Sequence, residues 1–211
     1  MTLLGALPAR FRRERVLIVG CGDVGQRAAR ELGRGRRVRL LALTSTAGRA
    51  SELRLQGITP LVGNLDRPRD LQRLAGLATR VLHLAPPPSE GQADWQTDPR
   101  TRALVRALAR RSPPTSLVYG STTGVYGHCE GRWVDESTPT RPQTPRAWRR
   151  VDAEASVHWL ARALGVRSTV LRIPGIYAPD RPGGTPQDRL RRGTPVLRPE
   201  EIGRASCRER V

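Results

Sequence analysis

The chain has 211 residues, of which 37% are hydrophobic and fall into short runs, so it can form one well-buried domain and part of a second but no membrane span of roughly 20 apolar residues. Its formal net charge is +18, and all 37 basic residues are arginine. The arginines are spread along the chain and only 4% of residues are aromatic, unlike a nucleic-acid binder, so we expect a solvated arginine-rich surface with no specific nucleic-acid partner and no membrane partner.

Short apolar runs alternate with helical segments along the chain. The first run, residues 15–19, is continuous and contains β-branched side chains, as expected of a strand buried on both faces. A long helix starts at Thr144-Pro145, with Thr as N-cap and Pro at the first helical position. The predicted strands are residues 15–19, 38–43, 59–62, 81–85, 116–119 and 168–173, and the predicted helices are residues 24–32, 50–56, 69–77, 101–111 and 145–165. This alternation predicts an α/β fold with a doubly wound parallel sheet, the Rossmann fold.

A glycine-rich loop, Gly20-Cys21-Gly22-Asp23-Val24-Gly25, lies between the first strand and the first helix. In this context Gly20 allows the tight turn, Gly22 lets the backbone approach a pyrophosphate, and Gly25 lets the helix pack closely on the strand. The start of the helix, at Asp23 and Val24, offers unpaired N–H groups and the positive end of the helix dipole to an anion. The loop therefore predicts a site for the diphosphate of NAD or NADP.

The end of the second strand bears on the choice of cofactor. NAD-specific sites place an acidic residue there, about 20 residues beyond the loop, to bind the ribose 2′-hydroxyl. Here the strand runs into Thr44 and Ser45, with Arg49 just beyond, and no acid is present. Hydroxyl groups and an arginine suit a 2′-phosphate better, so these residues favour NADP and leave NAD open. Residues 85–99, beginning with Ala85, follow the fourth strand and are predicted to form part of the pocket wall.

Four further motifs follow the glycine loop. They are Gly63-Asn64-Leu65-Asp66 after the third strand; residues 117–127, with a Ser/Thr-rich end and Val125-Tyr126-Gly127; Asp135-Glu136 with Pro139, Pro142 and Pro145; and Leu171-Arg172 with Pro174, Tyr177 and Pro179. In this order and spacing they resemble the extended and atypical short-chain dehydrogenase/reductases, the NAD-dependent epimerase/dehydratase family. The resemblance implies that Asn64, in place of the usual Asp, and Leu65 meet the adenine, and that Pro174 lies on the nicotinamide side.

The long helix departs from the pattern of that family. There it carries Tyr-x-x-x-Lys: the tyrosine exchanges the substrate proton, the lysine lowers its pKa, and a Ser/Thr on the preceding strand holds the carbonyl oxygen. These positions fall here on Arg146 and Arg150, and the Ser/Thr position falls on Thr122. An arginine keeps its proton near neutral pH and is a poor proton donor, and the chain has no lysine. The resemblance therefore places the chain with the atypical members, whose reaction is often unassigned.

Two functions from different classes follow. In the first, an NAD(P)-dependent oxidoreductase or epimerase/dehydratase acts on a small molecule such as a nucleotide-sugar or a carbonyl compound. Tyr126 or Tyr177 would be its acid, Thr122 would polarise the substrate, and Arg146 or Arg150 would bind an anionic group. In the second, the protein binds NAD(P) without turnover, as a sensor or regulatory module. The enzyme is favoured, by analogy of fold.

Neither a metal site nor a disulfide framework is expected. His128-Cys129-Glu130 are adjacent on a loop, where side chains rarely converge on one ion, and no further ligands follow at a usable spacing. The three cysteines are Cys21, Cys129 and Cys207, which are widely spaced and odd in number. Residues 1–15 contain no apolar run leading to a cleavage site, so no signal peptide is expected. A cytoplasmic protein is the simplest interpretation.

The domain organisation is predicted as residues 1–173 for the NAD(P)-binding Rossmann domain and residues 174–200 for the truncated start of a smaller C-terminal substrate domain. Residues 201–211 match the conceptual translation of a common sequencing-adapter read, so we expect this tail to be an artefact of the gene sequence. A chain truncated in this way would leave its cofactor cleft open on the substrate side, with apolar surface exposed.

Overall fold

The chain is described by a computed structural model over residues 14–34, 38–89, 94–130, 132–178, 180–181 and 185–193. The tail at residues 201–211 lies outside the described residues, and so does the part of the predicted second-domain start beyond residue 193.

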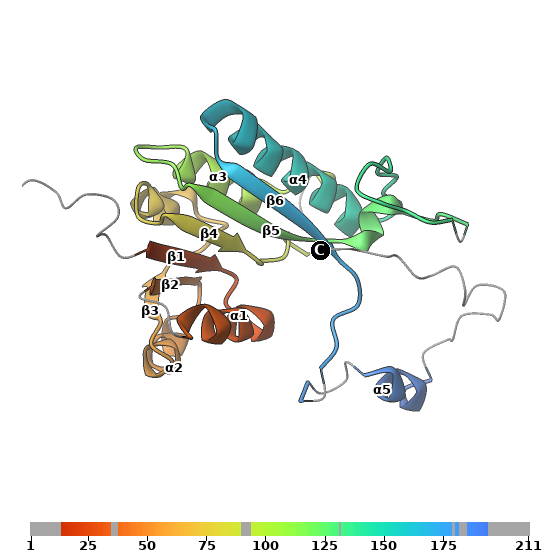
Figure 1. The fold of residues 1–211 in the computed structure, drawn as a ribbon, viewed down its shortest axis with the longest axis horizontal. Helices are drawn as coiled ribbons and strands as arrows, with labels where there is room; N and C mark the ends of the chain where they lie inside the picture. Colours follow the sequence, from red (N-terminus) through yellow and green to blue (C-terminus); the bar gives the residue numbers. More distant parts are fainter. Residues whose placement is uncertain are drawn as a thin grey trace, which may run out of the picture.

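Six parallel strands form one sheet in the order β3-β2-β1-β4-β5-β6. Their bounds are β1 (Glu14–Val19), β2 (Val38–Thr44), β3 (Thr59–Val62), β4 (Arg80–His83), β5 (Ser116–Thr122) and β6 (Arg167–Ile173). Because all pairs are parallel, the carboxyl ends of the strands meet at one edge (Figure 1). This is the strand order of the classical dinucleotide-binding sheet, and the predicted fold class is confirmed.

Helices cover both faces of this sheet (Figure 1). Their bounds are α1 (Asp23–Gly33), α2 (Ala50–Leu55), α3 (Pro99–Leu108), α4 (Pro145–Leu164) and α5 (Pro186–Arg191), with 3₁₀ helices η2 (Ala47–Arg49), η3 (Pro68–Leu74) and η4 (Thr123–Tyr126). The helices α1 and α2 pack on one face, and η3, α3 and α4 pack on the other. The carboxyl edge of the sheet is left to the loops.

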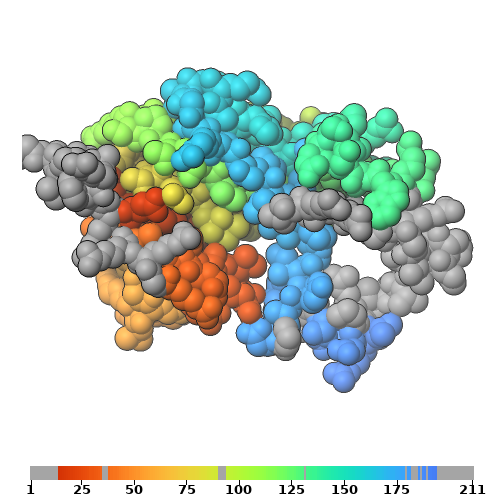
Figure 2. Space-filling view, in the orientation of Figure 1, coloured from red at the N-terminus to blue at the C-terminus, as the bar shows by residue number. Residues whose placement is uncertain are grey.

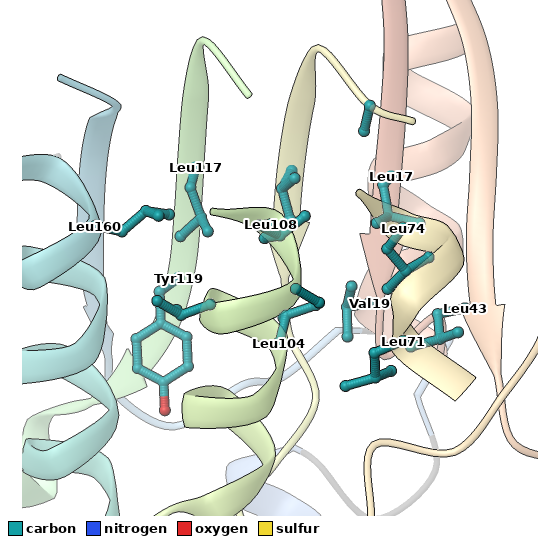
Figure 3. Packing of buried hydrophobic residues seen from close by; sticks show 14 of the residues in the cluster. Leu17, Val19, Leu43, Leu71, Leu74, Leu104, Leu108, Leu117, Tyr119 and Leu160 are labelled. Atoms are coloured by element: carbon teal, nitrogen blue, oxygen red, sulfur yellow. The ribbon is translucent and has the colours of Figure 1, made fainter. Parts of the chain in front are cut away.

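The strand β1 is buried on both faces, as its continuous apolar run predicts. Successive side chains of a strand point to opposite faces, so Leu17 and Val19 join the core under η3, α3 and α4, while Val16 and Ile18 join the core under α1 and α2. Figure 3 shows the first of these cores, in which leucines of the helices meet those of the strands. Two hydrophobic layers therefore hold β1, and with it the glycine loop, in a fixed position.

Local signals set the helix ends in most places. Thr144 Oγ1 accepts from Ala147 N at 3.2 Å, as the Thr-Pro start predicts, and Gly165 adopts a left-handed conformation directly after α4. The helix α3 begins at Pro99, two residues before the predicted start, because Asp98 caps it by accepting from the amides of the second and third residues that follow it. The segment predicted as a helix over 69–77 is instead the 3₁₀ helix η3, which ends where Ala75 turns extended.

Candidate functional site

The three glycines of the loop have different surroundings. Gly20 has φ +90°, and a Cβ there would lie 2.4 Å from Ala85 N. A Cβ at Gly25 would lie 2.9 Å from Gly20 O, because α1 packs closely on the loop. In contrast, a Cβ at Gly22 would meet no atom within 4 Å. Open space at Gly22 between two crowded glycines is the geometry that a bound pyrophosphate requires.

The first turn of α1 is open to an anion. Gly22 is the N-cap and makes no side-chain cap bond, so the amides of the first turn, from Asp23 through Val24 to Gly25, have no partner within the helix. The Asp23 carboxylate does not cap these amides; it pairs with Arg27 at 2.9 Å and with Arg181 at 3.6 Å. The loop and the helix start together fit the diphosphate of a dinucleotide.

The residues at the end of β2 lie beside this loop. Arg49 Nη2 donates to Cys21 O at 3.1 Å, and Arg49 Nε lies 3.6 Å from Glu52 Oε2. The Thr44 hydroxyl is bonded locally to the backbone of Thr46, whereas Ser45 is exposed. The fold therefore brings the guanidinium of Arg49 to the glycine loop.

The end of β3 contributes a turn held by two acids. Asn64 N donates to Asp70 Oδ2 at 3.0 Å, and Asn64 Oδ1 accepts from Asp66 N at 2.9 Å. Asp66 in turn accepts two hydrogen bonds from Arg100 at 2.6 and 2.7 Å, and this guanidinium lowers the pKa of the Asp66 carboxyl. Leu65 is half-buried against the core. These bonds hold residues 64 and 65 at the carboxyl edge, beside β2.

The residues that the sequence predicts to meet the substrate lie at the end of β5 and on α4. Thr122 closes β5, and its Oγ1 accepts from Gly124 N at 3.3 Å. Arg146 is exposed in the first turn of α4. Arg150, one turn further, is buried and donates through Nη1 to Tyr119 Oη at 3.1 Å and to Gly120 O. Of the two arginines, only Arg146 is therefore accessible to a ligand. Arg150 is hydrogen-bonded to β5 and stabilises the position of that strand.

Tyr126 belongs to a buried polar network. Its hydroxyl donates to Asp135 O at 2.8 Å and accepts from Arg172 Nη1 at 2.8 Å. Arg172 also pairs with Glu154 at 2.9 Å, and Glu154 accepts from Ser121 Oγ. The network joins η4, α4, β5 and β6 next to Thr122. Sequence reasoning named Tyr126 and Arg172 separately; nothing local to either residue indicates that Glu154 connects them.

A second buried network, between the end of β4 and the start of α3, was not predicted. His83 Nε2 lies 2.8 Å from Thr101 Oγ1, and that hydroxyl donates to Asp98 Oδ2 at 2.6 Å. Because the single hydroxyl proton goes to the carboxylate, Nε2 of His83 carries a proton and donates to Thr101. Burial, together with the charge of Arg150, lowers the pKa of His83 to about 3. The imidazole is therefore neutral in the folded chain. The Asp98-Pro99 helix start was the one local signal for this network.

The neutral His83 makes stability depend on pH. In the unfolded chain this imidazole takes up a proton below about pH 6.5, but in the folded chain only near pH 3, so stability falls as the pH drops through this window. We expect the effect to reach about 2 to 3 kcal/mol between pH 6.5 and about 4.5. Urea unfolding across this range should show a shallower loss for His83→Asn than for the natural chain. Equal pH slopes would contradict a neutral buried imidazole.

The segment after β6 runs beside the first turns of α1. Asp180 lies 2.9 Å from Arg27 Nη2, and Arg181 lies 3.6 Å from Asp23. Figure 2 shows this segment, in blue, beside the orange-red surface of α1. Pro174 and Tyr177 are exposed along it, with Tyr177 71% exposed. The phenol of Tyr177 therefore points into solvent, where a ligand could reach it.

Neither a metal-binding cluster nor a membrane-spanning helix is found among the described residues. They contain no group of three His, Cys, Asp or Glu side chains placed to hold a metal ion, and this includes the surroundings of Cys129. No helix within the described ranges combines the length and the apolar character that crossing a membrane demands.

Together, the strand order and the open Gly22 define a dinucleotide-binding protein of the Rossmann type. The sequence model of the NAD dependent epimerase/dehydratase family matches residues 16–193, so the chain belongs to this family. The predicted resemblance is confirmed. No curated protein matches the chain.

Solved structures share the fold. A UDP-glucuronic acid 4-epimerase from Bacillus cereus in complex with NAD superposes with a TM-score of 0.68 at 21% identity, over 83% of this chain and 62% of that chain. A Thermus thermophilus UDP-glucose 4-epimerase in complex with NAD superposes with a TM-score of 0.65 at 23% identity, over 86% of this chain and 64% of that chain. A functionally unknown conserved protein from Silicibacter pomeroyi superposes with a TM-score of 0.61 at 29% identity, over 80% of this chain and 56% of that chain. The matched part of this chain thus spans less than two thirds of each of these structures.

Proposed function

We propose that the chain binds a nicotinamide dinucleotide across the carboxyl edge of its sheet, with NADP preferred over NAD. The geometry of the glycine loop supports this proposal most directly. A Cβ at Gly22 would meet no atom within 4 Å, whereas Gly20 and Gly25 are closely packed. The first-turn amides of α1 would hold the diphosphate. Thr44, Ser45 and Arg49 would hold the 2′-phosphate, and residues 64, 65 and 85 would enclose the adenosine. Pro174 would lie on the nicotinamide side.

The preferred chemistry is that of an oxidoreductase or an epimerase/dehydratase. A bound nicotinamide supplies hydride transfer. Thr122, at the end of β5, would donate a hydrogen bond to a substrate oxygen, and Arg146, which is exposed, would bind an anionic group. Arg150 and Tyr126 would position β5 and η4, because their polar atoms are already bonded within the protein. Tyr177 is the exposed phenol that could move a proton.

The substrate class proposed is a nucleotide-sugar or a carbonyl compound. Two of the similar structures are epimerases named for UDP-sugars, and one of that kind was solved with UDP-glucuronic acid and NAD. An exposed arginine at the start of α4 suits the phosphates of such a molecule. We propose residues 174–193, which leave the sheet after β6, as the start of the substrate-binding part, and a cytoplasmic location, in which the free thiols of Cys21 and Cys129 would stay reduced.

A sensor without turnover is the second candidate. It is favoured by Arg146 and Arg150, which stand where the family has its Tyr and Lys, and by a chain without lysine. The absorbance of reduced nicotinamide, followed with a panel of nucleotide-sugars and carbonyl compounds, separates the two. Turnover that Thr122→Ala and Tyr177→Phe each diminish supports the enzyme. Saturable cofactor binding without turnover on any member of the panel supports the sensor.

The preference for NADP depends on Arg49. Arg49→Gln removes a guanidinium that lies at the glycine loop, and a charge-assisted bond to phosphate is worth about 1.5 to 3 kcal/mol, so NADPH affinity should fall at least about 10-fold. NADH affinity should change little. Fluorescence titration with both cofactors measures this, and Arg54→Gln, which removes an exposed arginine from α2, serves as the matched control. An equal loss of affinity for NADPH and NADH would instead mean that Arg49 stabilises the glycine loop and does not bind the 2′-phosphate.

A further inference from the structure

A cavity of about 600 Å³ lies at the edge of the sheet, between the end of β3 and η3. Four arginines line it: Arg67, Arg69 and Arg73 from η3 and the turn before it, and Arg111 from the turn after α3. Ser45 and Asn64 line the same cavity, and both belong to the adenosine end of the proposed dinucleotide site. The two sites are therefore neighbours.

The charge of this cavity is not balanced by the protein. Asp70 is the carboxylate in its lining, and it already accepts a hydrogen bond from Asn64 N at 3.0 Å. Among the described residues, none of the four arginines forms an ion pair or a side-chain hydrogen bond. Many other arginines of this chain do pair with an acid; Arg27, Arg100 and Arg102 are examples. The positive charges of four arginines that line one cavity without a paired acid repel one another, and an anion would relieve that repulsion.

The backbone makes room for one of these cations. A Cβ at Gly63 would lie 3.3 Å from Arg73 Nη2 and 3.3 Å from Asp70 Cβ. The absence of a side chain at Gly63 thus lets the guanidinium of Arg73 lie against the end of β3, where it faces the cavity. Planar guanidinium groups bind phosphate oxygens through two parallel hydrogen bonds.

We propose that this cavity binds a phosphorylated small molecule carrying at least two negative charges. The volume falls in the range of small-molecule sites. The described lining contains no aromatic side chain on which a base of a nucleic acid could stack. That the cavity lies next to the adenosine of a bound dinucleotide rests on the proposed function. That the cavity binds an anion does not depend on the proposed function. A ligand bound here would contact Ser45 and Asn64, and would thereby change the affinity for the dinucleotide.

Isothermal titration calorimetry with inorganic pyrophosphate tests this, in the presence of saturating NAD to occupy the glycine loop. The double variant Arg69→Gln/Arg73→Gln should weaken pyrophosphate binding at least about 10-fold, equivalent to about 1.4 kcal/mol. Arg54→Gln/Arg162→Gln, which removes two exposed arginines from α2 and α4, is the matched control and should change it less than about twofold. Equal thermal midpoints of all three chains establish that the exposed substitutions leave the fold intact.

Other outcomes overturn the proposal. An equal loss of pyrophosphate affinity in the two double variants would show that binding depends only on the net charge of the protein. Displacement of pyrophosphate by NADPH but not by NAD would make the cavity the 2′-phosphate site of the cofactor. Tighter binding of a single-stranded oligonucleotide, lost in the Arg69/Arg73 variant, would make it a nucleic-acid site. A failure of NAD to saturate the natural chain counts against the proposed function alone, because pyrophosphate binding that depends on Arg69 and Arg73 would persist without it.

Discussion

Gly20→Ala is expected to lower the free energy of unfolding by about 3 kcal/mol and to abolish dinucleotide binding. At φ +90° a side chain is strained, and the new Cβ would lie 2.4 Å from Ala85 N, a backbone atom that cannot move aside alone. The loop would have to shift away from the end of β4. Urea unfolding and fluorescence titration with NADPH measure the two effects.

Gly22→Ala is the matched control for that substitution. Its Cβ would meet no protein atom within 4 Å, and the loss of a glycine N-cap costs about 1 kcal/mol at most. Stability should therefore stay nearly unchanged while NADPH affinity falls, because the methyl group occupies the space proposed for the diphosphate. If Gly22→Ala bound NADPH normally, the diphosphate would lie elsewhere. If Gly20→Ala unfolded like the natural chain, the close contact with Ala85 would be wrong.

Glu154→Ala is expected to destabilise the fold by about 3 kcal/mol. Glu154 is 3% exposed, pairs with Arg172 at 2.9 Å and accepts from Ser121. Its removal would leave the Arg172 guanidinium largely buried without a counter-charge, the situation in which breaking an ion pair costs most. Arg172 would keep its hydrogen bond to the Tyr126 hydroxyl and its contact with the Tyr126 ring. Urea unfolding followed by circular dichroism measures the loss.

A double substitution separates the charge from the packing. Glu154→Leu/Arg172→Leu removes both charges, so it should be less destabilised than Glu154→Ala despite the larger change. Glu154→Gln keeps an acceptor for Ser121 and should fall between the natural chain and Glu154→Ala. A loss below about 1 kcal/mol for Glu154→Ala would mean that Arg172 is solvated well enough to stand without its partner.

The glycine loop was readable from the sequence because its signals are local. Three glycines at the right spacing, an apolar run before them and a helical pattern after them all lie within residues 15–33. In the structure Gly20 and Gly25 are closely packed and the space at Gly22 is open. The same holds for α4, whose cap and end are set by residues at its own termini. The boundaries that failed, at η3 and at α3, depend on how those segments meet their neighbours.

The candidate site residues show the opposite behaviour. The sequence places Thr122, Tyr126, Arg146 and Arg150 near the same part of the fold, but it does not distinguish an exposed arginine from a buried one. Only packing against β5 decides that Arg150 braces the strand while Arg146 faces solvent. Only packing also decides that the Tyr126 hydroxyl is bonded on both sides.

The sequence by itself determined the alternation of strands and helices, the glycine loop and the family, because each rests on a few neighbouring residues or on motifs in order. The tertiary structure alone decided that Arg49 reaches the loop, that Glu154 connects Ser121 to Arg172, and that four arginines surround one cavity. These groupings join residues far apart in the chain. These residues come into contact only after the crossover connections have set the order of the strands in the sheet. No local sequence pattern predicts that order.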